Sequence, residues 1–173
     1  NHIDHCDDLS LEVARDNNIK IIGPHSVIKR AKRLGATLVD ELAPGEVYRL
    51  DGILIKALHA NHPFAKDALM YMIYGNKKVF FSGDTRYTSD LYEALKSSPP
   101  DIALVQAACA HYFVIGNDGM SLSEVTNLGN DIKPSWIFLI HLHCAGKWLD
   151  RNHGIRIKKN NQMEVIKTLE HWK

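Results

Sequence analysis

The stretch Val79-Phe80-Phe81-Ser82-Gly83-Asp84-Thr85 carries an apolar strand directly into a Gly-Asp-Thr turn. Its run of β-branched and aromatic residues predicts a strand at 78–81. Because the following residues are small or polar, the carboxylate of Asp84 is expected to project from the end of a rigid strand. A carboxylate in such a place is a common ligand for a divalent metal ion.

Three further places offer His or Asp side chains in similar surroundings. His62 lies in Ala60-Asn61-His62-Pro63, just past a strand predicted at 53–58, and His141 ends another at 136–140. The first residues contain His2-Ile3-Asp4-His5, where a turn can direct several ligands into one cavity. A single His at a strand end is commonly a structural, hydrogen-bonded residue. Four such places in one chain favour a shared metal centre.

The bulk composition narrows the class of protein. The chain has 173 residues, 45% of them hydrophobic and 24% charged, which predicts one globular domain spanning 1–173. Its formal net charge of +1 gives no long-range attraction to nucleic acid or to an anionic membrane. Three cysteines without CxxC spacing predict no disulfide framework and a reducing, cytoplasmic compartment. No apolar run is long enough to cross a bilayer.

Periodicity and turn residues predict a mixed α/β architecture, with antiparallel hairpins first and α/β units afterwards. Helices are expected at 8–17, 25–34, 89–96 and 122–132, and helical spacing recurs at 161–172. Strands are expected at 19–22, 38–40, 47–50, 53–58, 68–74, 78–81, 102–106 and 135–142. Gly35 is expected to close the second helix. Asp8 is expected to cap the first helix, or alternatively to support the ligand cluster.

The order of these motifs resembles that of the metallo-β-lactamase superfamily. The family carries an H-x-H-x-D-H loop, a later single His, an Asp in a G-D-T segment and a final His after a strand. Here His2-Ile3-Asp4-His5, His62, Gly83-Asp84-Thr85 and His141 stand in that order. The resemblance runs through Leu142 and is greatest to the branch with L-ascorbate-6-phosphate lactonase and N-acyl-phosphatidylethanolamine phospholipase D.

The resemblance implies an α/β (α+β) fold, the αββα metallo-β-lactamase-type sandwich. The family's first histidine would lie two residues before His2, and its β-rich N-terminal half would precede that. Because the chain begins with Asn1, we expect it to be the C-terminal portion of a longer protein.

Carried over residue by residue, the resemblance implies two divalent metal ions. The implied ligands are His2, His62 and the family's histidine upstream of His2 for one ion, Asp4, His5 and His141 for the other, and Asp84 as the bridge. The upstream histidine is not part of this chain, so one site is expected to lack a ligand here. Imidazole and carboxylate ligands without thiolate fit Zn²⁺ or Mn²⁺, and after them Fe²⁺.

The implied activity is hydrolysis. Two neighbouring cations share a hydroxide whose pKa falls from about 15.7 towards about 7, and this nucleophile would attack an ester, lactone, amide or phosphodiester. Asp4 and Asp84 are the expected catalytic carboxylates, Asp4 by orienting the nucleophile or accepting a proton. The alternatives are a di-iron oxidoreductase, whose branch has Glu in place of His2, and a metal-binding fragment without activity. The expected partner is a small or lipid-like ester or phosphodiester, no nucleic acid is expected, and a homo-oligomer is left open.

Several side chains are candidates for substrate contact. Arg86 could bind a phosphate or carboxylate bidentately or form a surface ion pair. His111 and Tyr112 lie in an expected loop, where they would meet a substrate. His143 could share the strand face of His141, so it is a substrate-contact candidate and the alternative last ligand.

Two other residues have competing interpretations. His59 and His62 point to opposite sides of an extended strand, and His62 is preferred as the ligand because it lies beyond the strand. His59 is expected to be structural. Cys6 beside His5 is expected to be a small buried residue, with a thiol ligand as the alternative.

Overall fold

The computed structural model describes residues 6–63, 65–107, 111–112, 116–141, 153–157 and 163–167. Its helices are α1 (Asp8–Asp16), α2 (His25–Arg33), α3 (Ser89–Ser97) and α4 (Leu122–Ile132). Its strands are β1 (Ile21–Gly23), β2 (Val39–Glu41), β3 (Val47–Leu50), β4 (Ile53–His59), β5 (Leu69–Tyr74), β6 (Lys78–Phe81), β7 (Ile102–Gln106), β8 (His111–Tyr112), β9 (Gly116–Asn117), β10 (Trp136–Ile140), β11 (His153–Ile157) and β12 (Met163–Lys167). The predicted elements before residue 141 agree with these bounds to within two residues.

The centre of the fold is a six-stranded sheet in the order β10-β7-β6-β5-β4-β3. Strands β3 to β6 form an antiparallel meander, whereas β6, β7 and β10 run parallel. Strand β4 therefore runs in the same direction as β6, β7 and β10. The carboxyl ends of these four strands lie at the same end of the sheet. This end carries the predicted site residues and is called the site edge below.

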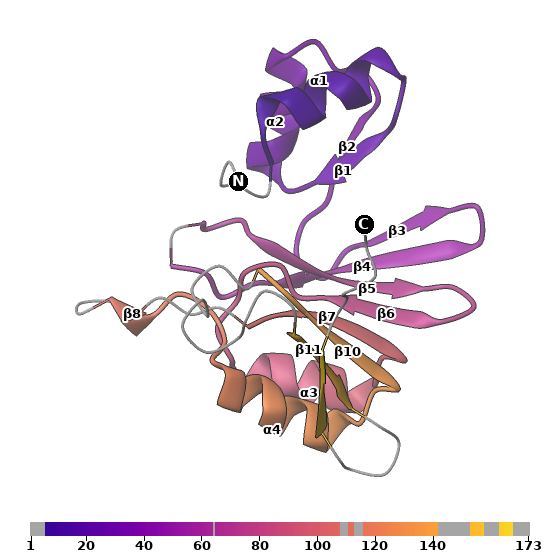
Figure 1. Cartoon of the computed structure of the whole chain (residues 1–173). Helices are drawn as coiled ribbons and strands as arrows, with labels where there is room; N and C mark the ends of the chain where they lie inside the picture. The colour runs from indigo at the N-terminus through magenta and orange to yellow at the C-terminus, as the bar shows by residue number, and fades with distance from the viewer. Residues whose placement is uncertain are drawn as a thin grey trace.

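Different elements cover the two faces of this sheet. Figure 1 shows α3 and α4 side by side below the sheet, and α1, β1, α2 and β2 together above it. The parallel connections from β6 to β7 and from β7 to β10 contain α3 and α4, so both helices pack on one face. None of the helices in the described part of the chain has both the length and the hydrophobicity needed to cross a membrane.

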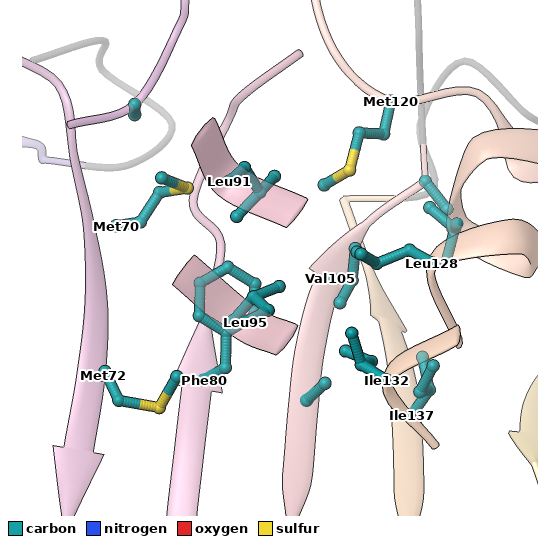
Figure 2. Packing of buried hydrophobic residues seen from close by; sticks show 14 residues of the cluster. Met70, Met72, Phe80, Leu91, Leu95, Val105, Met120, Leu128, Ile132 and Ile137 are labelled. Atoms are coloured by element: carbon teal, nitrogen blue, oxygen red, sulfur yellow. The ribbon is translucent and has the colours of Figure 1, made fainter. Parts of the chain in front are cut away.

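The main core lies between the sheet and these two helices. Phe80 on β6 is completely buried, and Figure 2 shows its ring among Met72, Leu95 and Val105. On the other side of Val105, Ile137 from β10 packs with side chains of α4. This contiguous apolar packing fixes the positions of β6, β7 and β10, because removing these side chains from water is the dominant favourable term in folding.

Residues 6–41 form a smaller unit with its own core. Leu11 of α1 packs against Ala31 of α2 and Ala36. Leu42, just past β2, joins this unit to the sheet by packing with Ala57 and Leu69 on β4 and β5. The face of the sheet opposite α3 and α4 is therefore covered near the site edge.

The start of α1 differs from the prediction by one residue. Asp7, and not Asp8, is the N-cap, since its carboxylate accepts a hydrogen bond of 2.8 Å from the backbone N–H of Ser10. Asp8 is the first helical residue, and its carboxylate instead accepts a bond of 2.5 Å from Nε of Arg30. The Asp8 cap prediction is wrong because a long-range Arg partner takes that carboxylate and leaves the preceding Asp to satisfy the helix end.

Two other predictions fail for the same kind of reason. Residues 163–167 of the tail form β12, which pairs antiparallel with β11, with Val165 opposite Ile155. The predicted helical spacing was wrong there because a partner strand decides the conformation of a short apolar segment. His111 and Tyr112 form β8, paired with β9, and not an irregular loop.

We expect Phe80→Ala to lower the free energy of unfolding by about 3–5 kcal/mol, since it leaves a cavity in the centre of the core. Phe138→Ala is the matched control, because Phe138 is 50% exposed and should cost less than about 1 kcal/mol. Urea denaturation followed by circular dichroism measures both. Equal losses would contradict the core described above.

Asp67 provides a pH-dependent test of the contact between α2 and the loop before β5. Its carboxylate accepts a hydrogen bond of 2.8 Å from the backbone N–H of Ser26 at the start of α2. Burial alone would raise the pKa of Asp67, but the hydrogen bonds from Ser26 lower it below the ordinary 3.8. A lowered folded-state pKa contributes stability above the unfolded-state pKa, and this contribution is lost as the pH falls through the folded-state pKa.

Asp67→Asn should therefore reduce the free energy of unfolding by about 0.5–1.5 kcal/mol at pH 7. The difference from the wild type should shrink as the pH falls below 3.8. Thermal unfolding across this pH range measures it, with the exposed Glu93→Gln as control. A deficit that persists unchanged at low pH would show that the charge of Asp67 is not responsible.

Candidate functional site

The site residues that the structure describes gather at the edge where β4, β6, β7 and β10 end. Asp84 lies three residues beyond β6, His62 three residues beyond β4, and His141 directly after β10. Because these strands share one direction, their ends lie at the same edge. Gln106, the last residue of β7, lies on the strand between those of Asp84 and His141 and is 2% exposed.

Asp84 and His141 are neighbours. Oδ1 of Asp84 lies 3.9 Å from Nδ1 of His141, and their side chains are 10% and 25% exposed. Both of these atoms are buried from solvent. A carboxylate oxygen and an imidazole nitrogen are thus held close together away from water.

The backbone around both residues takes unusual conformations. Gly83 has φ +50, and a Cβ at that position would lie 3.3 Å from the carbonyl oxygen of Leu69. His141 has φ +57, which costs a residue other than glycine roughly 1–2 kcal/mol. Gly83 follows β6 and His141 follows β10, so the packing of these strands in the sheet holds the backbone of both residues in place.

The turn after β6 is fixed to β7 by buried hydrogen bonds. The hydroxyl of Ser82 donates to the carbonyl of Gly83 at 2.7 Å and accepts from the N–H of Gln106 at 2.8 Å. The backbone N–H of Thr85 donates to the side-chain oxygen of Gln106 at 3.1 Å. The backbone is therefore bonded to Gln106 of β7 both before Asp84, through Ser82, and after it, through Thr85.

The position of the Gln106 side chain in turn depends on Gly119, in the segment before α4. A Cβ on Gly119 would lie 2.3 Å from the side-chain oxygen of Gln106, which is far inside van der Waals contact. Only a glycine leaves room for the Gln106 amide to reach Thr85. Neither Gln106 nor Gly119 is among the predicted site residues. Gln106 could have been found, because it is a polar residue at the end of an apolar strand, which is the pattern that predicted His141.

Thr85 also joins this turn to the loop that carries His62. Its hydroxyl accepts from the backbone N–H of Asn61 at 3.0 Å and donates to the carbonyl of Arg86 at 3.1 Å. The backbone N–H of Arg86 donates to the carbonyl of Asn61 at 2.9 Å. The loop after β4 and the turn after β6 therefore hold each other in register.

The ring of His62 has a defined orientation. Its Nδ1 lies 2.9 Å from the backbone carbonyl oxygen of Asp118. A carbonyl can only accept a hydrogen bond, so Nδ1 carries the proton and Nε2 carries the lone pair in the neutral ring. Nε2 is buried. This is the arrangement that metal-binding histidines commonly adopt, with the remote ring nitrogen donating to a carbonyl.

A cavity of about 180 Å³ opens beside these side chains. His62, Gly83 and Asp84 line it, together with Cys6 and the apolar or aromatic side chains Pro24, Val27, Ala65, Ala68, Leu69, Tyr71 and Phe81. Burial raises the pKa of Tyr71 to about 12, so its phenol is neutral. Burial also raises the pKa of the Cys6 thiol, and this half-buried side chain packs against the cluster of Leu11, Ala31 and Ala36.

The remaining predicted residues are placed as follows. His59 is exposed on β4 and lines a second cavity of about 340 Å³ with Thr88 and Asp90. Arg86 is half-buried, and its Nε donates to the carbonyl oxygen of Asn117. Outside the described residues lie His2, Asp4, His5 and His143, and the side chains of His111 and Tyr112 are not described either. Within the described residues, no three His, Cys, Asp or Glu side chains surround one position for a metal ion.

Comparison with known proteins identifies the family. The sequence family described as "Beta-lactamase superfamily domain" matches residues 1–142. The chain belongs to this family. A UPF0173 protein of Pyrococcus abyssi is 36% identical over 169 residues, which cover 98% of this chain and 76% of that protein. The UPF0173 metal-dependent hydrolase of Thermoplasma acidophilum is 27% identical over 117 residues, which cover 64% of this chain and 51% of that protein.

Solved structures show the same fold. Igni18, a metallo hydrolase of Ignicoccus hospitalis, superposes with a TM-score of 0.67 at 21% identity, covering 81% of this chain and 60% of that one. CmlA, a diiron β-hydroxylase of Streptomyces venezuelae, gives a TM-score of 0.68 at 16% identity, covering 80% of this chain and 34% of that one. The predicted superfamily and the metallo-β-lactamase-type fold are confirmed, and the comparisons support an enzyme of that fold, as predicted.

We expect Gly119→Ala to destabilise the site edge. The added methyl group would displace the Gln106 amide and leave the buried N–H of Thr85 without its acceptor, at a cost of about 1–3 kcal/mol. Gly75→Ala is the control, because a Cβ there would meet nothing closer than 4.0 Å. Denaturant unfolding compares the two, and a neutral Gly119→Ala would contradict the close packing of Gln106.

Proposed function

We propose that this chain carries the ligand residues of a metal-dependent hydrolase. In this proposal His62, Asp84 and His141 are metal ligands, together with His2, Asp4 and His5. The observation that supports it best is the 3.9 Å approach of Asp84 Oδ1 and His141 Nδ1 at the sheet edge that also carries His62. The family match across residues 1–142 and the metal-dependent hydrolase of Thermoplasma acidophilum among the relatives agree with it.

The described donors suit a divalent cation. His62 presents the lone pair of Nε2, because its Nδ1 donates to Asp118. The carboxylate of Asp84 is 10% exposed, and a carboxylate so far from water is stable where positive charge and hydrogen-bond donors surround it. Imidazole and carboxylate ligands are those preferred by Zn²⁺, Mn²⁺ and Fe²⁺. We propose two ions, with Asp84 shared between them.

Each residue has a defined part in the proposed hydrolysis. Bound divalent ions would supply an acidified water and Lewis-acid polarisation of the scissile carbonyl or phosphoryl group. Asp84 and the histidines hold the charge of the centre in place before the reaction, so little reorganisation accompanies it. Asp4 orients the attacking water or accepts its proton.

The substrate is proposed to be a small or lipid-like ester, lactone, amide or phosphodiester. The cavity next to His62 and Asp84 has walls of neutral side chains, including Leu69, Tyr71 and Phe81, which suit an uncharged apolar substituent. The formal net charge of +1 provides no field that would attract a nucleic acid, so this class of partner is not proposed.

The second candidate is a di-iron oxidoreductase on the same fold. The superposition with the diiron β-hydroxylase CmlA raises this alternative. Against it, the di-iron oxidoreductase branch considered in the sequence analysis has Glu at the position where this chain has His2. Oxygen consumption separates the two candidates, because only the oxidoreductase consumes oxygen, whereas the hydrolase could also hold Fe²⁺.

Removing the proposed bridging carboxylate tests the metal centre. We expect the whole protein to bind about two divalent ions and its Asp84→Asn variant to retain at most one, because the amide keeps the shape but loses the charge and one donor oxygen. Hydrolysis of a panel of ester, lactone, acyl-amide and phosphodiester substrates should fall at least ~10²-fold.

Inductively coupled plasma mass spectrometry of the purified proteins measures the ion content. Asp90→Asn is the matched control, since it also removes one carboxylate, from the first turn of α3, and should leave metal content unchanged. Equal metal content in the wild type and Asp84→Asn would rule out the bridging role.

A further inference from the structure

Two consecutive backbone carbonyls in the segment before α4 are each used by one side chain of the site. Asn117 O accepts from Nε of Arg86, and Asp118 O accepts from Nδ1 of His62 at 2.9 Å. His62 and Asp118 are 56 residues apart in sequence. The position of this short segment therefore decides where the acceptor for the His62 ring lies.

Arg86 is well placed to hold that segment. Its backbone N–H donates to the carbonyl of Asn61 at 2.9 Å, next to His62 in the chain. Its side chain donates from Nε to the carbonyl of Asn117. One residue thus connects the loop that carries the ring of His62 with the segment that carries the acceptor of that ring.

We infer that Arg86 is a positioning residue for His62. Its Nε–H bond to Asn117 holds the Asp118 carbonyl where it accepts the Nδ1 proton of His62, so that the ring stays in the tautomer with its lone pair on Nε2. This inference rests on the proposed function, in which Nε2 binds a metal ion. It differs from the substrate-anion role predicted for Arg86, because it uses Nε–H as a donor and does not use the positive charge.

The positioning role and the positive charge of Arg86 have opposite expected effects on metal affinity. A positive side chain near a dication repels it, so removing the charge alone should leave metal affinity unchanged or raise it slightly. Loss of a bond that orients a ligand lowers metal affinity, typically about 10–100-fold. A fall in metal affinity in Arg86→Met that is absent in Arg86→Gln is therefore the effect expected of the positioning role.

Glutamine offers a matched substitution, because its side-chain nitrogen occupies the same place along the side chain as Nε of arginine. Arg86→Gln keeps a donor for the Asn117 carbonyl and removes the charge. Arg86→Met keeps the length and removes both. Arg86→Lys keeps the charge but moves the donor one atom further along a flexible chain.

The experiment measures metal affinity of the full chain by chelator competition with Zn²⁺ and with Mn²⁺, at a temperature where circular dichroism shows each variant folded. We expect Arg86→Met to lose about 10–100-fold in affinity at one of the two sites, and Arg86→Gln to stay within about threefold of wild type. Arg86→Lys should fall below Arg86→Gln despite its charge, and it replaces Arg86→Met if the latter does not fold.

The tautomer of His62 gives a readout that is independent of metal and activity. In ¹⁵N-labelled, metal-free protein, the imidazole nitrogens should show the proton on Nδ1 in the wild type and in Arg86→Gln. A mixed population is expected in Arg86→Met. A role confined to overall stability would change the unfolding temperature without changing this tautomer.

A double-variant cycle separates the inference from the proposed function. If His62→Ala retains its full metal content, the ligand assignment is wrong and the proposed function fails. If His62→Ala loses metal and the Arg86→Met effect simply adds to it, the inference alone is overturned, because coupled residues give non-additive effects. Wild-type metal affinity in Arg86→Met, with KM raised equally in Arg86→Met and Arg86→Gln, would overturn the inference in favour of the substrate-anion role.

Discussion

The hydrogen bond of 3.1 Å from the backbone N–H of Thr85 to the side-chain oxygen of Gln106 is the contact on which the site edge depends. Both residues are almost completely buried. Breaking such a bond leaves a donor that water cannot reach, which costs about 1–3 kcal/mol. Because the bond crosses from the turn after β6 to the end of β7, the position of Asp84 follows from the packing of two neighbouring strands.

The rest of the site extends from this bond. The Thr85 hydroxyl fixes Asn61, Arg86 reaches Asn117, and Asp118 accepts from His62. Each step uses a backbone group as one partner, so the geometry depends on where the loops run more than on which surface side chains they carry. The apolar core around Phe80 supplies the rigid base, since it fixes the strands from which these loops emerge.

The sequence predicts the elements of this fold better than their long-range contacts. Strands β6 and β7 and helix α4 agree with the predicted bounds because turn or capping residues enclose their apolar patterns. The pattern at 163–167 was misread as helical because Met163 and Val165 fit a strand as well, and the pairing with β11 decides between them. The strand-end positions of His62, Asp84 and His141 could be predicted from local pattern. The contact between Gln106 and Gly119 could not, because it depends on the path of the segment before α4.

The distribution of backbone strain gives an independent indication of where function lies. Four residues other than glycine in the described part of the chain have positive φ. Asn18 and Lys133 follow helices and Asp51 lies in a hairpin turn, where left-handed backbone is ordinary. His141 instead directly follows β10, a strand of the parallel part of the sheet. This left-handed backbone costs roughly 1–2 kcal/mol, and it occurs beside Asp84. Local rules are commonly broken at functional sites, and here the break coincides with a residue that the motif order had already selected.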